Sequence, residues 1–137
     1  MQFAVRTLRF CRTLPGTWES RRVGGQLIDA STSTAMNYRA AGRGRSHREF
    51  TAKLGTVVEE ADESLGWLEL IAQVPITKGA ELTWLLGEAR ELVAIFGSSY
   101  ATAKEKDERE RAEKKRRSRE RKTNRRSADH PITDSPI

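Results

Sequence analysis

Residues 37–70, NYRAAGRGRSHREFTAKLGTVVEEADESLGWLEL, decide the fold of this chain. The stretch begins with small residues and arginines, is interrupted by Gly42 and Gly44, and continues as a regular apolar pattern. Ser46 and Glu49 have the spacing of a capping box, in which the serine hydroxyl accepts from the Glu49 amide while the glutamate reaches back toward the cap. The stretch therefore predicts two antiparallel helices joined by a short turn at residues 44–46.

The segment after this turn predicts the most regular helix of the chain. Apolar residues recur there at steps of three or four, which places them on one helix face, and the pattern ends before Pro75 and Gly79. The members of this stripe are Phe50, Leu54, Val57, Ala61, Leu65, Leu68 and Ala72.

Three further segments show helical periodicity. The first covers residues 2–13 and is stopped by Pro15; its pattern starts at Met1 itself, so we expect this helix to be truncated. The second runs from Glu19 or Ser20 to Ala41, and another begins near Ala80. Short connections and the absence of a strand pattern predict an all-α, antiparallel up-down-up-down four-helix bundle over residues 1–103. The expected packed positions are Val23, Leu27, Ala30, Thr34, Tyr38, Ala41, Leu82, Leu85, Leu86, Ala89, Leu92, Val93, Phe96 and Tyr100.

The segment before the turn is rich in small residues. Gly24 and Gly25 predict either a close crossing by another helix or a weak helix start, because glycine is unfavourable inside helices. Hydroxyl groups such as that of Ser31 must bond a backbone carbonyl or a polar partner when they are buried.

The charge of the chain changes after residue 103. Residues 104–126 contain 13 Lys and Arg against 6 Asp and Glu, whereas residues 1–103 contain 12 against 11. The apolar stripe disappears there, and Glu and Lys or Arg recur four residues apart in the order that supports a helix. We predict a basic extension over 104–126, either helical or disordered, and a disordered tail over 127–137, which holds two prolines. The expected pairs are Glu105 with Arg109, Glu110 with Lys114, and Glu113 with Arg117.

No catalytic or metal-binding pattern is present in the sequence. A di-metal site in a bundle needs Glu-x-x-His on two helices, and neither His47 nor His130 follows a glutamate at that spacing. Cys11 is the single cysteine, so it forms no intrachain disulfide, and we interpret it as a small apolar helix residue rather than a reactive thiol. We predict a protein that is not an enzyme and that uses no metal, cofactor or small-molecule substrate.

A group of carboxylates in the second half of the stretch is interpreted structurally. If the turn lies at residues 44–46, facing positions have numbers that sum to about 90, which places Ser31 beside Glu60 and Leu27 beside Glu63. We expect Glu60 and Glu63 to accept hydrogen bonds from the hydroxyl groups or from arginines of a neighbouring helix or subunit. Trp18, Trp67 and Trp84 are expected to be packing residues, and the predicted structural or interface residues are Tyr38, Glu60, Glu63 and Trp67.

Two groups of basic residues are candidates for contact with phosphate. Arginine forks match phosphate groups, and such contacts would be independent of nucleic-acid sequence. The alternatives are a solvated end of the bundle with intersubunit ion pairs, and a solvated charged helix. The candidates at the turn are Arg39, Arg43, Arg45 and Arg48, and those in the extension are Lys114, Lys115, Arg116 and Arg117.

The N-terminal segment does not have the sequence of a secretory signal. Arg6, Arg9 and Arg12 interrupt its apolar residues, and no apolar run in the chain approaches the roughly 20 residues that span a bilayer. We expect a cytoplasmic protein without membrane contact.

Phe3 to Lys104 resembles the bacterial four-helix-bundle family of the 23S ribosomal RNA intervening-sequence proteins. The resemblance rests on Gln26-Leu27, Asn37-Tyr38-Arg39, Arg43-x-Arg45-Ser46, Glu49-Phe50, Lys53-Leu54, Glu60-Ala61-Asp62-Glu63, Trp67-Leu68-Glu69 and Glu91-Leu92. That family is similar in turn to the accessory variability determinant of diversity-generating retroelements, a basic pentameric bundle that works beside a reverse transcriptase and its RNA. The resemblance implies a non-enzymatic homopentamer with a role in nucleic-acid or ribonucleoprotein biology.

Two functions are therefore expected, in this order. The first is an oligomeric adaptor that contacts RNA or DNA, or a nucleic-acid enzyme such as a reverse transcriptase, through its basic surfaces. The alternative is a structural or protein-interaction module without nucleic-acid contact, in which the charge serves solubility and subunit pairing.

Overall fold

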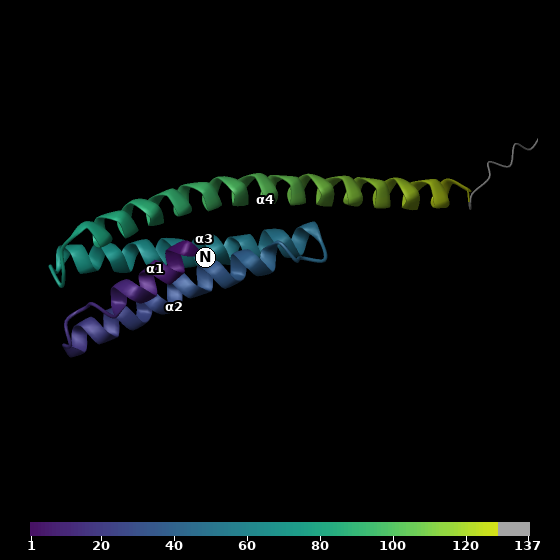
Figure 1. Cartoon of the computed structure of the whole chain (residues 1–137). Helices are drawn as coiled ribbons and strands as arrows, with labels where there is room; N and C mark the ends of the chain where they lie inside the picture. Colours follow the sequence, from purple (N-terminus) through teal and green to yellow (C-terminus); the bar gives the residue numbers. More distant parts are fainter. Residues whose placement is uncertain (129–137) are drawn as a thin grey trace, which may run out of the picture.

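The computed structural model describes residues 1–128 and consists of four α-helices (Figure 1). They are α1 (Gln2–Cys11), α2 (Trp18–Ala41), α3 (His47–Gln73) and α4 (Ala80–Ala128), and no strand occurs in this part of the chain. The predicted all-α four-helix bundle is confirmed.

The helices pack as a ring in which each contacts its neighbours along the chain. α2 packs on α3, α3 packs on α4, and α1 closes the ring against α2 and α4. Since α1 has 10 residues whereas α2 has 24 and α3 has 27, α1 covers only part of the side between α2 and α4. Figure 1 shows α1 along the half of the bundle away from the α2–α3 turn.

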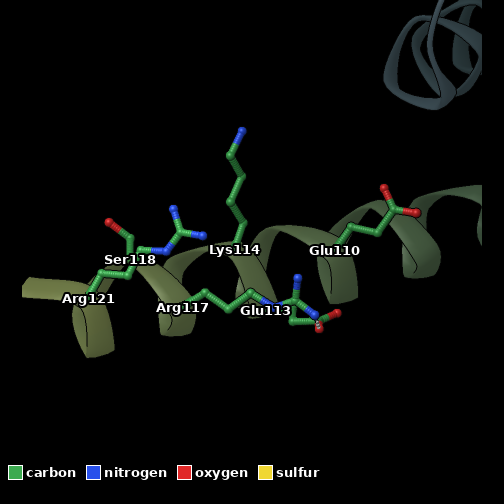
Figure 2. A pocket seen from close by; sticks show the side chains of 6 residues that line it. All are labelled: Glu110, Glu113, Lys114, Arg117, Ser118 and Arg121. Carbon is green, nitrogen blue, oxygen red and sulfur yellow. Dashed lines mark hydrogen bonds and ion pairs between the residues drawn. The ribbon is translucent and has the colours of Figure 1, made fainter. Parts of the chain in front are cut away.

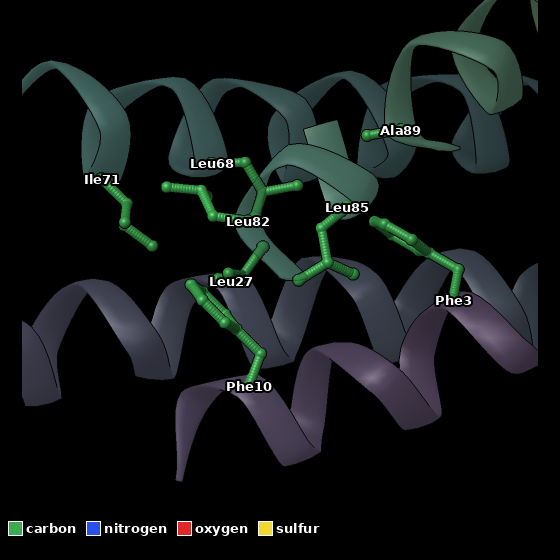
Figure 3. Close-up of a cluster of buried hydrophobic side chains, with 8 residues drawn as sticks. All are labelled: Phe3, Phe10, Leu27, Leu68, Ile71, Leu82, Leu85 and Ala89. Carbon is green, nitrogen blue, oxygen red and sulfur yellow. The ribbon is translucent and has the colours of Figure 1, made fainter. Parts of the chain in front are cut away.

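The core is divided into two clusters along the bundle axis. The first takes side chains from all four helices, and Figure 3 shows Phe3 and Phe10 of α1 pointing toward the leucines of α2 and α4. Its members are Phe3, Phe10, Leu27, Leu68, Ile71, Leu82, Leu85 and Ala89. The second cluster comes from α3 and α4 alone and consists of Leu54, Val57, Ala61, Phe96 and Ala103. α1 contributes Phe3 and Phe10 to the first cluster and no residue to the second, so it stabilises mainly the first. Burying each of these large side chains contributes about 1.5–3 kcal/mol.

The exposure of three residues differs from the sequence-based prediction. Ile71, not Ala72, is buried at the end of α3, because the buried positions of this helix continue in alternating steps of three and four. Tyr38 is 56% exposed, although its ring packs against Phe96 near the start of α1. Trp18 is 68% exposed at the first residue of α2, so its assignment as a packing residue was wrong.

Local features of α2 and α3 follow from their sequence. The Ser46 hydroxyl accepts from the Glu49 amide at 3.1 Å, and the Glu49 carboxylate accepts from the Arg45 amide at 3.0 Å, which confirms the capping box. The Ser31 hydroxyl donates to the Ile28 carbonyl at 3.2 Å. It therefore satisfies its hydrogen bond within its own helix and does not donate to Glu60.

Gly24 marks a close approach between α2 and the chain at the end of α1. A Cβ atom at this position would lie 3.1 Å from Leu14 Cδ1, whereas one at Gly25 would meet nothing within 4 Å. Leu14 belongs to the connection that follows α1, and Cys11 Cβ at the end of α1 would be 3.8 Å from the same atom. Of the two alternatives for this glycine pair, the close approach therefore holds for Gly24, which leaves room for Cys11 and Leu14.

α4 continues as one helix beyond the bundle. Ala103 is its last buried residue, and every side chain described after it is exposed except that of Asp107, which is partly covered. The predicted extension over 104–126 is thus helical. With a rise of about 1.5 Å per residue, residues 108–128 project roughly 30 Å past the bundle. α4 also includes residues 127 and 128, and the rest of the predicted tail, residues 129–137, lies outside the described part of the chain.

Candidate nucleic-acid interface

The α2–α3 turn lies against α4 where α4 leaves the bundle. His47, the first residue of α3, has Nε2 3.1 Å from the carbonyl oxygen of Ala103 and 3.7 Å from Oδ1 of Asp107. The His47 ring also lies 6.0 Å from the ring of Phe50. These contacts place the turn at the base of the extension, as Figure 1 shows.

The arginines predicted around the turn are all solvent-exposed. Arg39 is in the last turn of α2, Arg43 and Arg45 are in the connection, and Arg48 is in the first turn of α3. None of them takes part in an ion pair within the described residues. We call these four residues the tip arginines; they are exposed around the turn whose His47 contacts Ala103 and Asp107 at the base of the extension.

The extension divides into two parts by charge. Residues 104–113 contain four Lys and Arg against five Asp and Glu, whereas residues 114–125 contain eight against one. We call residues 114–125 the basic segment and residues 104–113 the spacer. The positive charge of the chain is thus concentrated at the end of α4 that is farther from the bundle.

Few of these charges are neutralised within the helix. Arg117 pairs with Glu113, and Arg116 lies 3.7 Å from Glu120. Of the three pairs predicted for the extension, only that of Glu113 with Arg117 is formed in the described residues. Such exposed pairs contribute about 0.3–0.5 kcal/mol each, and they leave Lys114 and Lys115 without an acidic partner in this part of the structure.

The surface of the basic segment is convex. Figure 2 shows Glu110, Glu113, Lys114, Arg117, Ser118 and Arg121 along one stretch of α4, with Lys114 and Arg117 pointing to different sides of the helix. All six residues belong to a single helix, so they enclose no pocket for a small molecule. Their arrangement suits contact with an extended polyanion.

The predicted interface residues lie on two different sides of the bundle. The Tyr38 ring packs 5.2 Å from the Phe96 ring, beside a cavity of about 120 Å³ between the start of α1, α2 and α4. On α3, Glu63 Oε1 accepts a hydrogen bond from Trp67 Nε1 at 3.1 Å, and Glu60 is half-buried. A single chain does not bring Tyr38 together with the α3 residues.

One ion pair joins two helices that are not consecutive in the sequence. The guanidinium of Arg6 donates from Nε to Glu81 Oε1 at 2.8 Å and from Nη2 to Glu81 Oε2 at 2.6 Å, and it lies 3.4 Å from the centre of the Trp84 ring. The hydrogen bond from Arg6 lowers the pKa of the Glu81 carboxyl. This pair links α1 to α4, and sequence reasoning missed it because spacing along one helix does not reveal a partner on another.

The thiol of Cys11 is protected by its surroundings. Cys11 is partly buried where α1 crosses Gly24, and burial raises the pKa of its thiol to about 11. A thiol with such a pKa remains protonated at neutral pH and is a poor nucleophile. This agrees with the interpretation of Cys11 as a packing residue.

Residues 1–128 show neither a metal-ligand group nor a transmembrane helix. No three His, Cys, Asp or Glu side chains converge as metal ligands within the described residues. None of the helices in this part of the chain combines the length and apolar character that crossing a bilayer requires.

The comparisons with known proteins concern the fold. No family model and no curated protein matches the sequence of this chain. A solved structure from Bacteroides thetaiotaomicron, described as a protein of unknown function from the S23 ribosomal protein family, is similar with a TM-score of 0.66 and 24% identity. The match covers 72% of this chain and 92% of that protein. The likeness confirms the bundle fold that the resemblance to the intervening-sequence proteins implied.

Proposed function

We propose that this protein is a non-enzymatic helical-bundle adaptor that contacts nucleic acid through the tip arginines and the basic segment. The observation that supports it most is the placement of charge. Eight Lys and Arg against one acidic residue occupy the end of a helix that projects from the bundle beside four exposed arginines. Phosphate chains are the common polyanions whose charge spacing and geometry suit such a surface.

Counterion release supplies the free energy of this contact. A protein that neutralises several phosphates displaces the cations condensed on the nucleic acid, so its affinity falls steeply as salt is added. Neither group of basic residues belongs to a base-reading motif, so the contact is expected to be independent of sequence.

Assembly into a homopentamer is the second element of the proposal, and it rests on the resemblance to the intervening-sequence proteins and the accessory variability determinant. Several copies would multiply the weak phosphate contacts of one chain. The proposed subunit contacts involve Tyr38, Glu60, Glu63 and Trp67. One kind of partner proposed for the assembly is a reverse transcriptase with its RNA. The solution mass tests the pentamer, and Glu60→Ala tests the contact: a variant with unchanged size and unchanged melting would exclude Glu60 from it.

Salt-dependent binding of the full chain to a labelled RNA or DNA tests the phosphate contact. We expect log Kd to depend linearly on log salt between about 50 and 200 mM. Substituting Lys114, Lys115, Arg116 and Arg117 by Gln should weaken binding and reduce the slope by about three to four, whereas Arg43, Arg45 and Arg48→Gln should reduce it by about two to three.

A matched control removes charge from the opposite end of the bundle. Arg9, Arg12 and Arg22 are exposed at the end of α1 and the start of α2, and Arg9, Arg12 and Arg22→Gln should leave both affinity and slope nearly unchanged. The alternative function, a structural or protein-interaction module, predicts that the full chain is not retained by any polyanion even at low salt.

A further inference from the structure

The charged side chains of the basic segment are divided between two faces of α4. Successive residues of an α-helix are rotated by about 100°, so the angular position of each residue follows from its number. Six of the eight Lys and Arg are in no ion pair found among the described residues, and these six lie within a sector of about 160°. We call this sector the cationic face; its members are Lys114, Lys115, Arg119, Arg121, Lys122 and Arg125.

The opposite face of the basic segment is close to neutral. It holds both ion pairs of the segment and two uncharged residues, which are Arg117 with Glu113, Arg116 with Glu120, Thr123 and Asn124. The charges of each pair cancel, so the positive charge that remains belongs to one side of the helix. Contact with a surface of negative charge therefore uses the cationic face and leaves the opposite face in water.

The cationic face is on the side of α4 that meets the α2–α3 turn. Asp107 marks this side, since its Oδ1 atom lies 3.7 Å from His47 Nε2. Arg125 follows Asp107 by 18 residues, which is five full turns, and Lys114 follows it by seven, so both lie on nearly the same side of the helix as Asp107. Figure 1 shows the turn on the bundle side of α4, where the extension begins. The cationic face and the tip arginines therefore adjoin, and one polyanion can contact both.

The extension offers charge but nothing that holds an exposed base. No aromatic residue occurs between residues 104 and 125, whereas proteins that bind single strands stack the bases on aromatic side chains. A duplex needs no such partner, because its bases are stacked inside and its phosphates face outward with one charge per about 1.7 Å of axis. We infer that the cationic face lies along the phosphate backbone of a double-stranded nucleic acid. This inference rests on the proposed function and specifies its ligand.

Three labelled ligands with the same number of phosphates test the preference for a duplex: a DNA duplex, an RNA duplex and a single DNA strand. Each neutralised phosphate releases about 0.9 cations from a duplex but about 0.7 from a single strand, so six contacts favour the duplex about tenfold near 0.1 M salt. The two duplexes should bind the full chain within about threefold of each other, because phosphate contacts read no base.

Two results of this comparison would overturn the inference and leave the proposed function intact. One is a single strand that binds as tightly as the duplexes, and the other is a difference of more than about tenfold between the two duplexes. No binding by the full chain to any of the three ligands at low salt would overturn both the inference and the proposed function.

Two substitutions of equal charge test which face is bound. Ser118 lies in the cationic face and Asn124 lies on the opposite face, and both are exposed. Ser118→Glu places a carboxylate one turn from Lys114 and one turn from Lys122, and it should weaken duplex binding about five- to tenfold, the loss of about one phosphate contact near 0.1 M salt. Asn124→Glu is the matched control and should weaken binding by less than about threefold. Equal weakening by the two substitutions would contradict contact through one face.

Removal of charge from adjacent positions gives a second test of the face. Lys114 and Lys115→Gln removes two members of the cationic face and should lower the salt slope by about two. Arg116 and Arg117→Gln removes the same charge from the opposite face and should lower the slope by about one or less, because these arginines are paired with carboxylates. Circular dichroism should show equal helix content in the two variants. A larger effect of the arginine variant would place the contact on the opposite face, and the inference would be wrong.

Discussion

The two halves of α4 show how one continuous helix can be stabilised in two different ways. Between Ala80 and Ala103 the helix packs against α3 and α1 through Leu82, Leu85, Ala89, Phe96 and Ala103, which are buried, and through Leu92 and Tyr100, which are partly buried. After Ala103 it buries none among the described residues and carries charge on every side. The first half belongs to a packed fold, whereas the second half depends on local helix propensity and exposed ion pairs.

The bundle explains why the second half is helical. An isolated helix of this length is marginal in water because its first turn is costly to form, whereas adding residues to an existing helix is nearly neutral or favourable. The packed turn that ends at Ala103 supplies that first turn. His47 adds to it by contacting the Ala103 carbonyl and Asp107. We therefore expect the extension to open locally while the bundle stays folded.

Limited trypsin digestion should show the largest difference between the two halves. Cleavage at Lys and Arg within 104–125 should be more than about 100-fold faster than cleavage in the bundle, because the extension opens with little free energy whereas the bundle must unfold. Mass spectrometry of the digest should show a lasting fragment that ends near Lys104. Equal cleavage rates in the two regions would contradict independent opening.

Truncating a core residue should separate the two regions by stability. Leu68 is fully buried in the first cluster, and Leu68→Ala should lower the free energy of unfolding by about 3 kcal/mol. Lys114→Ala should change it by less than about 0.5 kcal/mol. Urea denaturation followed by tryptophan fluorescence measures both. A loss of the same size in the two variants would mean that the extension also packs.

Cysteine reactivity should differ between the regions in a pH-dependent way. Burial holds the pKa of the Cys11 thiol at about 11, above its ordinary value of 9.0. Alkylation of Cys11 near pH 8 should therefore be up to about 100-fold slower than that of an exposed thiol. A matched control is Ala112→Cys in a Cys11→Ala background, which places the thiol on the exposed spacer.

The same pKa shift gives a sign for stability against pH. The folded chain keeps the Cys11 proton where the unfolded chain loses it, so the stabilisation from this group is complete below pH 9.0 and is lost as pH rises through about 11. Cys11→Ala should abolish that part of the decline. In the alkylation experiment, equal rates for Cys11 and for the thiol introduced by Ala112→Cys would show that Cys11 is accessible and that α1 does not pack on Gly24.

The smallest expected effect concerns the ion pairs of the extension. Glu113→Gln removes the partner of Arg117 and should weaken the helix by about 0.3–0.5 kcal/mol. Cα chemical shifts of residues 110–120 should move toward coil values without any change in the bundle. Glu105→Gln is the control, because Glu105 is in no ion pair found among residues 1–125; a shift of equal size in both variants would mean that the specific pair does not matter.

Periodicity and end signals were sufficient to predict the fold. The stripes around Leu54 and Leu85 and the capping box at Ser46 depend only on residues within one helix, so they can be found in the sequence. The exposure of Trp18 and Tyr38 could not be predicted, because periodicity along α2 does not show which of its residues the other helices cover.

The candidate interface was predicted only in part. The tip arginines and the basic segment were recognised by composition, but their proximity depends on the contact of His47 with Ala103, two residues 56 positions apart. The bidentate pair of Arg6 with Glu81 is likewise a contact between helices far apart in the sequence. Such contacts depend on which helices pack side by side and at which level, and the pattern along a single helix does not encode this.

A chemical-shift titration of the isotope-labelled full chain with a short DNA duplex tests the division of roles most directly. The account predicts progressive shifts at residues 114–125 and at the turn around Arg43, with the amides of the first cluster, such as those of Leu27 and Leu68, unchanged. Shifts centred on the bundle faces of α1 or α3, with none in the basic segment, would contradict it.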